Sequence, residues 1–472
     1  MKKRLVFALI LIGVTAISSQ IIFVREFLTV FYGNELSVGF LLSVWLFGGA
    51  MGSFLAAALR KRSLPVSFAT FSNIQVLFFF LIPTSLILTR ITRIVFKISL
   101  GELVSIPTML AWSFVCLVPT CTLLGFLFVA GCSLYESGEA SSSKKIAGTY
   151  FLESIGATLG GIVTSLLLIR ILSNFEIAFL IAFLNLFSAY LLARACGPNA
   201  SVRRAILLIL MALFVLFSLV GGIKKIDQKA LELRWTGADL IKSKDSIYGN
   251  VVLAKISDEF VFFSNGLYTI GAPDRVTAED VVHFPMLMHP DPKHILLIGG
   301  GEGEALSEIL KYRGTKVTYV ELDPLPIKFA KQYLKKQPWY EFDNPRVAVK
   351  NTDARHFIQA TDLRFDVVII NLPNPYTAQI NRFYTLEFFR TLRNVLNEKG
   401  IVSFTVLSSQ NYISHELGDY LRSLYNTLKA NFKDVKIIPG DSAHFLASNT
   451  DDLITLDYNR IETSRKQKNI HT

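Results

Sequence analysis

The chain has 472 residues, of which 51% are apolar and 18% are charged. This length allows two or three domains, and the apolar content is high for a wholly soluble protein. Residues 1–222 carry most of the net charge of +11, because they hold 16 Lys and Arg against 7 Asp and Glu. The basic surplus therefore accompanies apolar segments instead of a soluble surface, which argues against a nucleic-acid-binding protein.

Seven apolar segments occupy residues 1–222. Each is about 20 residues long, which is enough to cross about 30 Å of hydrocarbon. We therefore expect an all-α, multi-pass membrane domain of about seven helices in contact with membrane lipid. The segments are residues 5–24, 37–59, 66–89, 107–131, 147–169, 173–193 and 205–222.

Small residues recur in two of these segments. Gly48 to Gly52 lie in the second segment, and Gly148 to Gly161 span the fifth. Such residues allow helices to approach closely, so tight packing is expected. Glu153 is the more specific candidate, because an acid within a span often marks a substrate path. It lies near one end of its segment, however, within reach of the interface.

Cysteine usage predicts neither disulfides nor a metal site. No C-x-x-C pair occurs, and the C-terminal half has no cysteine at all. Small packing residues are the expected role. The four cysteines are Cys116, Cys121, Cys132 and Cys196.

From Lys224 onward the composition is that of an ordinary soluble domain. Alternating apolar residues predict a small antiparallel β unit within residues 223–270. Residues 271–458 then alternate strands and helices, which predicts a Rossmann-like α/β sheet of methyltransferase type with its ligand at the carboxyl ends of the strands. The tail, residues 459–472, is polar and expected to fray. The expected strands are 251–256, 259–263, 266–270, 294–299, 316–321, 346–350, 366–371, 400–406, 434–438 and 443–448, and the expected helices are 303–312, 325–335, 354–360, 385–397 and 415–430.

A glycine-rich turn between a strand and a helix is the main chemical signal. It runs Gly299-Gly-Gly-Glu-Gly303, and glycines there let the backbone approach a nucleoside-bearing ligand. Glu321 ends the next strand, where a carboxylate can hold two ribose hydroxyls. Asp323 and Asp353 also follow strands, so each is either a ligand contact or a helix cap. The expected cofactor-binding residues are Gly299, Gly301, Glu302, Gly303, Glu321, Asp323 and Asp353.

A proline-stiffened loop follows the fourth strand of the expected sheet. It runs Asn371-Leu-Pro-Asn-Pro375, and Tyr384 follows shortly after it. This edge of the sheet is where a second substrate is expected. His283, upstream of the first strand, is more typical of a packed histidine than of a catalytic one.

The C-terminal half resembles the spermidine synthase family, the polyamine aminopropyltransferases, from about Tyr248 to Asn449. The N-terminal half resembles a membrane domain fused to such enzymes in bacteria. The motifs that carry the resemblance are Ser264-Asn-Gly-Leu267, His283-Phe-Pro-Met-Leu, Ile298-Gly-Gly-Gly-Glu-Gly, Val320-Glu-Leu-Asp, Asp353-Ala-Arg and Phe383-Tyr-Thr-Leu-Glu-Phe-Phe389 in the soluble half, with Arg25 to Glu35 and Trp45 to Ser53 in the membrane half.

The resemblance implies transfer of an aminopropyl group from decarboxylated S-adenosylmethionine to an amine such as putrescine. It implies no metal. A carboxylate should orient the amine and take its proton. The implied catalytic positions are Asn371, Asn374 and Tyr384, and the implied substrate-binding residues are Asp274, Glu279, Asp280 and His283.

This sequence departs from the family pattern on the amine side. The family has Asp at the positions of Asn371 and Asn374, and an amide is no base near pH 7. Its hairpin Gln and its Tyr-His pair before an acid correspond here to Thr269, Ala278 and Glu279, with Asp280 as the acid. Glu302 replaces the usual Asp of the glycine loop.

Three functions remain open. The first is an aminopropyltransferase for an unusual amine, in which Asp274, Glu279 or Asp280 supplies the negative charge. The second is a methyltransferase that uses intact S-adenosylmethionine. The third is a non-catalytic nucleoside-binding domain that regulates the membrane half. By analogy with the family, a homo-oligomer is possible.

The expected orientation in the membrane rests on two conflicting arguments. With seven crossings, the basic clusters at residues 2–4, 60–62 and 203–204 lie on the same side as the amino terminus. The positive-inside rule then places the soluble half outside the cell. A cytosolic adenosyl donor requires the opposite, and we give that argument more weight, since a short helix within residues 91–106 would change the count. We expect a multi-pass protein of the cell membrane with a cytoplasmic soluble domain.

Overall fold

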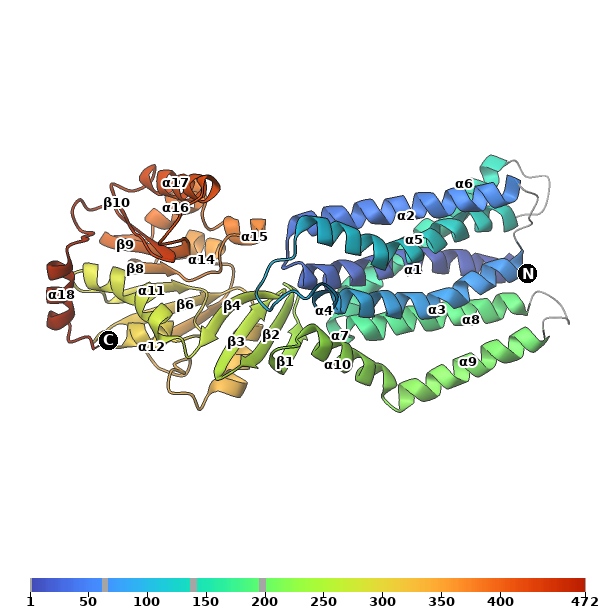
Figure 1. The fold of residues 1–472 in the computed structure, drawn as a ribbon, viewed down its shortest axis with the longest axis horizontal. Helices are drawn as coiled ribbons and strands as arrows, with labels where there is room; N and C mark the ends of the chain where they lie inside the picture. Colours follow the sequence, from blue (N-terminus) through green and yellow to red (C-terminus); the bar gives the residue numbers. More distant parts are fainter. Residues whose placement is uncertain (1, 62–66, 136–141, 195–200, 472) are drawn as a thin grey trace. The chain divides into compact units, whose positions relative to one another are not determined.

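A computed structural model describes the whole chain except residues 1, 62–66, 136–141, 195–200 and 472 (Figure 1). The chain divides into two compact units, Met1–Gly237 and Ala238–Thr472. Arg62 and Cys196, considered above, lie outside the described residues.

Unit 1 is a bundle of long apolar helices (Figure 1). Among the residues that the structure describes, seven helices are long and apolar enough, by length and composition, to cross a membrane. The segment between α3 and α5 contains α4, whose five residues are too few for a crossing. The elements are α1 (Lys2–Val30), α2 (Glu35–Lys61), α3 (Phe68–Arg90), α4 (Thr92–Phe96), α5 (Ile106–Leu134), α6 (Ser142–Val163), the π-helical turn η1 (Thr164–Leu168), α7 (Ile169–Ile171), α8 (Asn174–Ala193), α9 (Ser201–Leu219) and α10 (Gly222–Arg234).

Two glycines show how closely the helices of unit 1 pack. A Cβ atom added at Gly52 on α2 would overlap the carbonyl oxygen of Thr122 on α5. One added at Gly156 on α6 would overlap the carbonyl oxygen of Ile10 on α1. The expected tight packing is confirmed, because any side chain at these positions would push backbones apart. Glu153 lies on α6 with a partly exposed side chain.

A buried ionic network joins four helices of unit 1. Glu26 on α1 accepts hydrogen bonds from Arg90 on α3, with Oε1 to Nη2 at 2.8 Å, and from Nδ2 of Asn174 on α8 at 3.1 Å. Arg234 on α10 contacts its other oxygen, Oε2. Arg90 also donates to the carbonyl oxygen of Asp227 on α10 at 3.0 Å. The network therefore fastens α10 to α1, α3 and α8.

The boundary between the units lies later than residue 222. We expected residues 223–270 to form the β unit, but α10 packs on α3, α8 and α9, within unit 1. The reason is the network above, because Asp227 and Arg234 provide polar contacts with the bundle. The β unit begins at β1 (Asp239–Asp245), a strand that the sequence pattern did not reveal, and continues as β2 (Asn250–Ile256), β3 (Glu259–Ser264) and β4 (Leu267–Ala272).

Unit 2 contains this four-stranded antiparallel sheet and a seven-stranded sheet in the order β10-β11-β9-β8-β5-β6-β7. In the larger sheet β5 to β9 pair in parallel, and β10 and β11 add an antiparallel edge. The remaining elements are α11 (Arg275–Met288), β5 (His294–Ile298), α12 (Ala305–Leu310), β6 (Lys316–Glu321), α13 (Pro324–Phe329), the π-helical turn η3 (Ala330–Leu334), β7 (Val347–Asn351), α14 (Ala354–Ala360), β8 (Phe365–Ile370), α15 (Ala378–Asn381), α16 (Leu386–Arg393), β9 (Leu396–Leu407), α17 (His415–Lys429), β10 (Asp434–Ile438), β11 (Ser442–Ser448) and α18 (Tyr458–Gln467).

Helices cover both faces of the larger sheet. Alternate strand residues explain this, since Leu297 packs toward the core shared with α11, α12 and α13, and Leu296 toward the core shared with α14, α16 and α17. The chain leaves β5 toward β6 on one side and later enters β8 on the other. A topological switch point therefore lies between β5 and β8, where such sheets bind ligands.

The sequence pattern missed three helices of the described part of unit 2, which are α11, the short α15 and α18. The expectation of a frayed tail is wrong, since α18 forms there and Ile470 is buried. Nζ of Lys468 bonds to the carbonyl oxygens of Met286 and Leu287 at 3.0 Å each, so it caps α11. α11 was missed because Pro285 interrupts its pattern.

Candidate functional site

The glycine loop and the loop after β8 meet at the switch point. Gly299 and Gly300 have φ values of 72° and 63°, a left-handed conformation that glycine adopts without strain. A Cβ atom at Gly300 would collide with the side chain of Asn371. Nδ2 of Asn371 donates to the carbonyl oxygen of Gly300 at 3.3 Å. The side-chain amide of Asn371 therefore lies directly against the loop.

Two acids and a tyrosine lie together beside the glycine loop. The hydroxyl of Tyr319 donates to Oε1 of Glu302 at 2.7 Å and lies 3.3 Å from Oε2 of Glu321. Glu302 is buried, and Glu321 is partly exposed at the end of β6. The amide of Gly299 donates to the carbonyl of Val320 at 3.0 Å, which holds the loop next to this strand end.

This pair of carboxyl groups holds protons more tightly than free acids. Burial, followed by the nearby charge of Glu302, raises the pKa of Glu321 to about 8. Burial also raises the pKa of Glu302. The pKa of the Tyr319 hydroxyl is raised well above its ordinary value, again mainly by burial. Tyr319 therefore stays a donor, and Glu321 gains its charge only in mildly basic solution unless a ligand favours the ionised form.

Asp323 and Asp353 both cap helices. Asp323 accepts a hydrogen bond from the amide of Leu325 at 2.9 Å at the start of α13. Its second oxygen accepts from the hydroxyl of Ser246 at 2.5 Å. Both carboxylate oxygens of Asp323 therefore already accept hydrogen bonds within the protein. Asp353 caps α14 with one oxygen, and the other lies 2.7 Å from Nη1 of Arg382. Asp353 remains partly exposed at the edge where an adenine ring is expected.

Asn374 and Tyr384 lie in the loop region after β8. Oδ1 of Asn374 accepts from the amide of Leu407 at 2.7 Å, which ties the loop to the end of β9. The Tyr384 ring is buried against Phe404, and burial raises the pKa of its hydroxyl. That hydroxyl makes no hydrogen bond with the part of the chain that the structure describes. Tyr384 is thus a core residue with one unused polar atom.

The four expected substrate-binding residues do not gather at one place. Asp274 accepts from the amide of Thr277 at 3.2 Å and begins α11. Asp280 is exposed on the same helix. Glu279 and His283 instead join Glu308 of α12 in a separate cluster, with the carboxylate oxygen of Glu308 at 3.1 Å from Nε2 of His283. Asp274 lies near Glu304, the residue that directly follows the glycine loop.

Glu304 is a site residue that motif reasoning missed. It follows the glycine loop directly, and the nearby backbone amide of Asp274 offsets part of the effect of burial on the pKa of its carboxyl group. Burial raises its pKa. β4 packs over the same loop, since a Cβ atom at Gly303 would press on Ile270. The available signal was the second acid of the run Gly301-Glu-Gly-Glu304.

A family model supports the same interpretation of this half of the chain. The model of the spermine/spermidine synthase domain matches residues 275–439. The C-terminal half is therefore similar to the spermine/spermidine synthase domain. The resemblance seen in the sequence motifs is thereby confirmed.

Members of the spermine/spermidine synthase family are similar to this chain over part of their length. Polyamine aminopropyltransferase 2 of Aquifex aeolicus (strain VF5) is 29% identical over 272 residues, which cover 57% of this chain and 54% of the relative. The polyamine aminopropyltransferase of Saccharolobus solfataricus is 34% identical over 187 residues, covering 37% and 60%. The crystal structure of spermidine synthase from Thermotoga maritima aligns at 25% identity with a TM-score of 0.39, covering 46% of this chain and 75% of that one. The chain therefore spans about half the length of the first of these relatives.

Proposed function

We propose that this chain is a membrane-anchored, aminopropyltransferase-like enzyme that uses decarboxylated S-adenosylmethionine as donor and a putrescine-like amine as acceptor. The observation that supports this most directly is the position of Glu321. Its carboxylate ends β6, next to the glycine loop that ends β5, where it would accept hydrogen bonds from two ribose hydroxyls while the loop faces the rest of the adenosyl group.

The proposed reaction is a displacement at carbon. The lone pair of a neutral amine attacks the CH₂ group bonded to the sulfonium, a C–N bond forms and the C–S bond breaks. The electron pair of that bond stays on sulfur, which leaves methylthioadenosine. The nitrogen loses a proton to a base. Catalysis then depends on holding the amine in line and on taking that proton.

We assign the proton acceptor to Glu304. Asn371 and Asn374 are amides, whereas Glu304 is an acid with a raised pKa beside the glycine loop. Glu304→Gln should lower kcat about 10²-fold with little change in donor affinity, because a positioned base contributes about that factor. Single-turnover kinetics and donor titration on the same sample measure both quantities. Equal kcat in the variant and the parent would remove Glu304 from this role.

Asn371→Asp should raise aminopropyl transfer about tenfold by placing a second base at the switch point. The cost is one hydrogen bond to Gly300, which is long at 3.3 Å and contributes about 0.5–1 kcal/mol. Asn426→Asp is the matched control, since it introduces the same charge at an exposed position on α17, outside the loop after β8. Initial rates of methylthioadenosine release, with a series of amines, compare the three proteins. If Asn371→Asp binds donor normally yet gains no rate, the amine pocket is not catalytic.

A non-catalytic nucleoside-binding role is the second candidate. The observation in its favour is that Asn371 and Asn374 both use their amides in internal hydrogen bonds. Purified protein incubated with each adenosyl donor and an amine pool separates the candidates. Methylthioadenosine detected by mass spectrometry supports transfer, S-adenosylhomocysteine supports methylation, and tight binding with neither product supports the non-catalytic role.

We also propose that the seven apolar helices of unit 1 cross the cell membrane in contact with lipid, and that unit 2 lies in the cytoplasm. Length and composition support the first part. The second part rests on the location of the donor, against the positive-inside rule. A reporter enzyme that is active only outside the cytoplasm, fused after Thr472, should stay inactive. A homo-oligomer is proposed only from the family, and light scattering in detergent tests it.

A further inference from the structure

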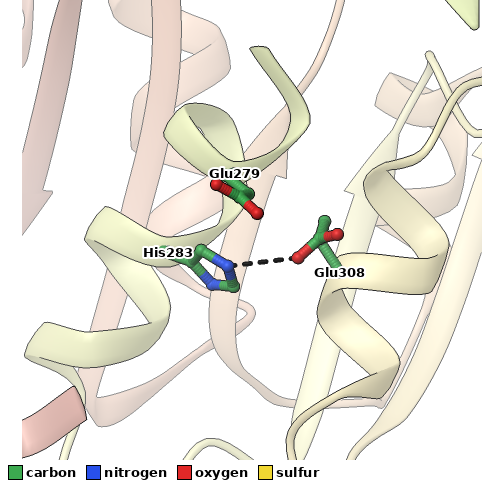
Figure 2. Close-up of side chains that lie close together, drawn as sticks. All are labelled: Glu279, His283 and Glu308. Atoms are coloured by element: carbon green, nitrogen blue, oxygen red, sulfur yellow. Dashed lines mark ion pairs between the residues drawn. The ribbon is translucent and has the colours of Figure 1, made fainter. Parts of the chain in front are cut away.

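A second cluster of chemistry-bearing side chains lies between α11 and α12, in unit 2. Figure 2 shows Glu279 and His283 on α11 pointing toward Glu308 on α12. One carboxylate oxygen from each acid and one ring nitrogen all lie within 4.8 Å of one another. Glu279 and His283 are four residues apart, so they share a helix face.

The closest contact within the cluster joins His283 of α11 to Glu308 of α12. Nε2 lies 3.1 Å from Oε2, and both side chains are more than nine-tenths buried. Nε2 of His283 makes no hydrogen bond of standard geometry with the described residues, and Oε2 of Glu308 is otherwise in contact only with the ammonium of Lys311 among them. Two ligand atoms at about 2.1 Å from one metal ion stand about 3.0–3.4 Å apart, which matches this spacing. Two buried acceptors turned toward a common point fit a shared cation.

The imidazole is also held as a metal ligand usually is. Nδ1 of His283 lies 3.0 Å from the hydroxyl of Tyr312. A hydrogen bond on the distal nitrogen fixes the ring orientation and leaves Nε2 free to coordinate. Tyr312 is itself buried, so the ring cannot turn easily.

Two basic side chains now neutralise the acids, and both lie at the rim. Nε of Arg275 lies 2.6 Å from Oε1 of Glu279, with the arginine side chain 56% exposed. Lys311 contacts Glu308 and is 30% exposed. A divalent ion that displaced Lys311 would balance the two carboxylates, and the lysine stem is long enough to turn its ammonium into solvent.

We propose that Glu279, His283 and Glu308 form a divalent transition-metal site that joins α11 to α12. Two carboxylate oxygens and one imidazole nitrogen suit zinc or manganese better than calcium. α12 directly follows the glycine loop and Glu304, so an ion there would steady the helix that positions the loop. The site is separate from the proposed reaction, in which the ion takes no part.

Zinc titration of the full-length protein in detergent, after chelator treatment and dialysis, tests the proposal. We expect one zinc ion per chain by calorimetry and a rise in Tm of about 5 °C at saturating zinc. Glu308→Gln and His283→Gln should each weaken binding more than about 100-fold, since even outer-shell partners of metal ligands contribute 10–100-fold.

Two further variants keep the test decisive if a buried substitution prevents folding. Lys311→Met removes the competing ammonium, so it should tighten zinc binding about tenfold; a purely structural ion pair would give no zinc binding in this variant. His415→Gln is the matched control, because His415 and Asp419 form an exposed pair with the same i,i+4 spacing, at 3.1 Å. Its zinc isotherm should equal that of the parent. Identical isotherms for the parent, Glu308→Gln and Lys311→Met would overturn the proposal.

Discussion

Glu26→Ala is expected to destabilise unit 1 by about 3–5 kcal/mol, the usual effect of removing one partner from a buried ion pair. The substitution would leave the guanidinium groups of Arg90 and Arg234 without their shared carboxylate, and both are buried. It would also remove an acceptor from Asn174. Thermal unfolding in detergent should show Tm lowered by roughly 6–20 °C.

The matched control for this prediction lies on α10. Glu232 pairs with Lys229 at 3.3 Å, and their side chains are 45% and 72% exposed. Glu232→Ala should change stability by less than about 1 kcal/mol, since exposed pairs contribute little. Glu26→Gln keeps the shape of the side chain without its charge, and its Tm should lie between those of Glu26→Ala and Glu232→Ala. Equal Tm values for Glu26→Ala and Glu232→Ala would show that the network contributes nothing to stability.

Glu321→Gln is expected to weaken methylthioadenosine binding about 10³-fold, because each hydrogen bond to a charged acceptor contributes about 1.5–3 kcal/mol and two ribose hydroxyls are involved. Calorimetry with the uncharged product isolates this effect from any attraction for a cationic donor. Glu387→Gln, an exposed acid on α16, serves as the control. Unchanged affinity in Glu321→Gln would exclude the proposed ribose contact.

The same contact predicts a pH dependence. The ionised form of Glu321 is the better double acceptor, and its pKa is raised to about 8. Affinity should therefore rise with pH up to about 8, by about tenfold for each pH unit below that value. Glu302→Gln removes the neighbouring acid, so the midpoint should move to lower pH. A midpoint that is the same in both proteins would contradict coupling between the two acids.

The stability of the ligand-free protein should depend on pH in the opposite direction to nucleoside affinity. The folded-state pKa of Glu321 lies above its ordinary value of 4.5. Its contribution to the free energy of unfolding is therefore fully present below about pH 4.5 and lost as the pH rises through 8. Ligand-free protein should become less stable over the pH range in which it binds nucleoside better.

The sequence predicted the parts of the fold that local patterns determine. Strands β5 to β8 are short apolar runs ended by glycine or polar residues, and their positions are confirmed within one or two residues. The glycine loop and Glu321 were predicted because a glycine-rich turn and an acid at the end of the next strand occur at a characteristic distance in the sequence. The seven apolar helices were found by length alone.

Local sequence patterns do not predict contacts between residues that are far apart in the chain. The placement of α10 depends on Glu26 and Arg90, which are far from it in the chain. α18 is polar, and it is held in place by the buried side chain of Ile470 and by Lys468, which bonds to carbonyl oxygens of α11. No pattern in the sequence indicated a metal site, because Glu308 joins Glu279 and His283 only through the packing of α12 beside α11.

Glu302 and Glu321 lie on either side of the Tyr319 hydroxyl, and this arrangement has a consequence for the heat of ligand binding. If a nucleoside selects the charged form of Glu321, a proton leaves for the medium on every association event near neutral pH. The heat of binding at pH 7 will then differ between phosphate and Tris, because the two buffers take up protons with different enthalpies. The slope of that difference counts the protons released.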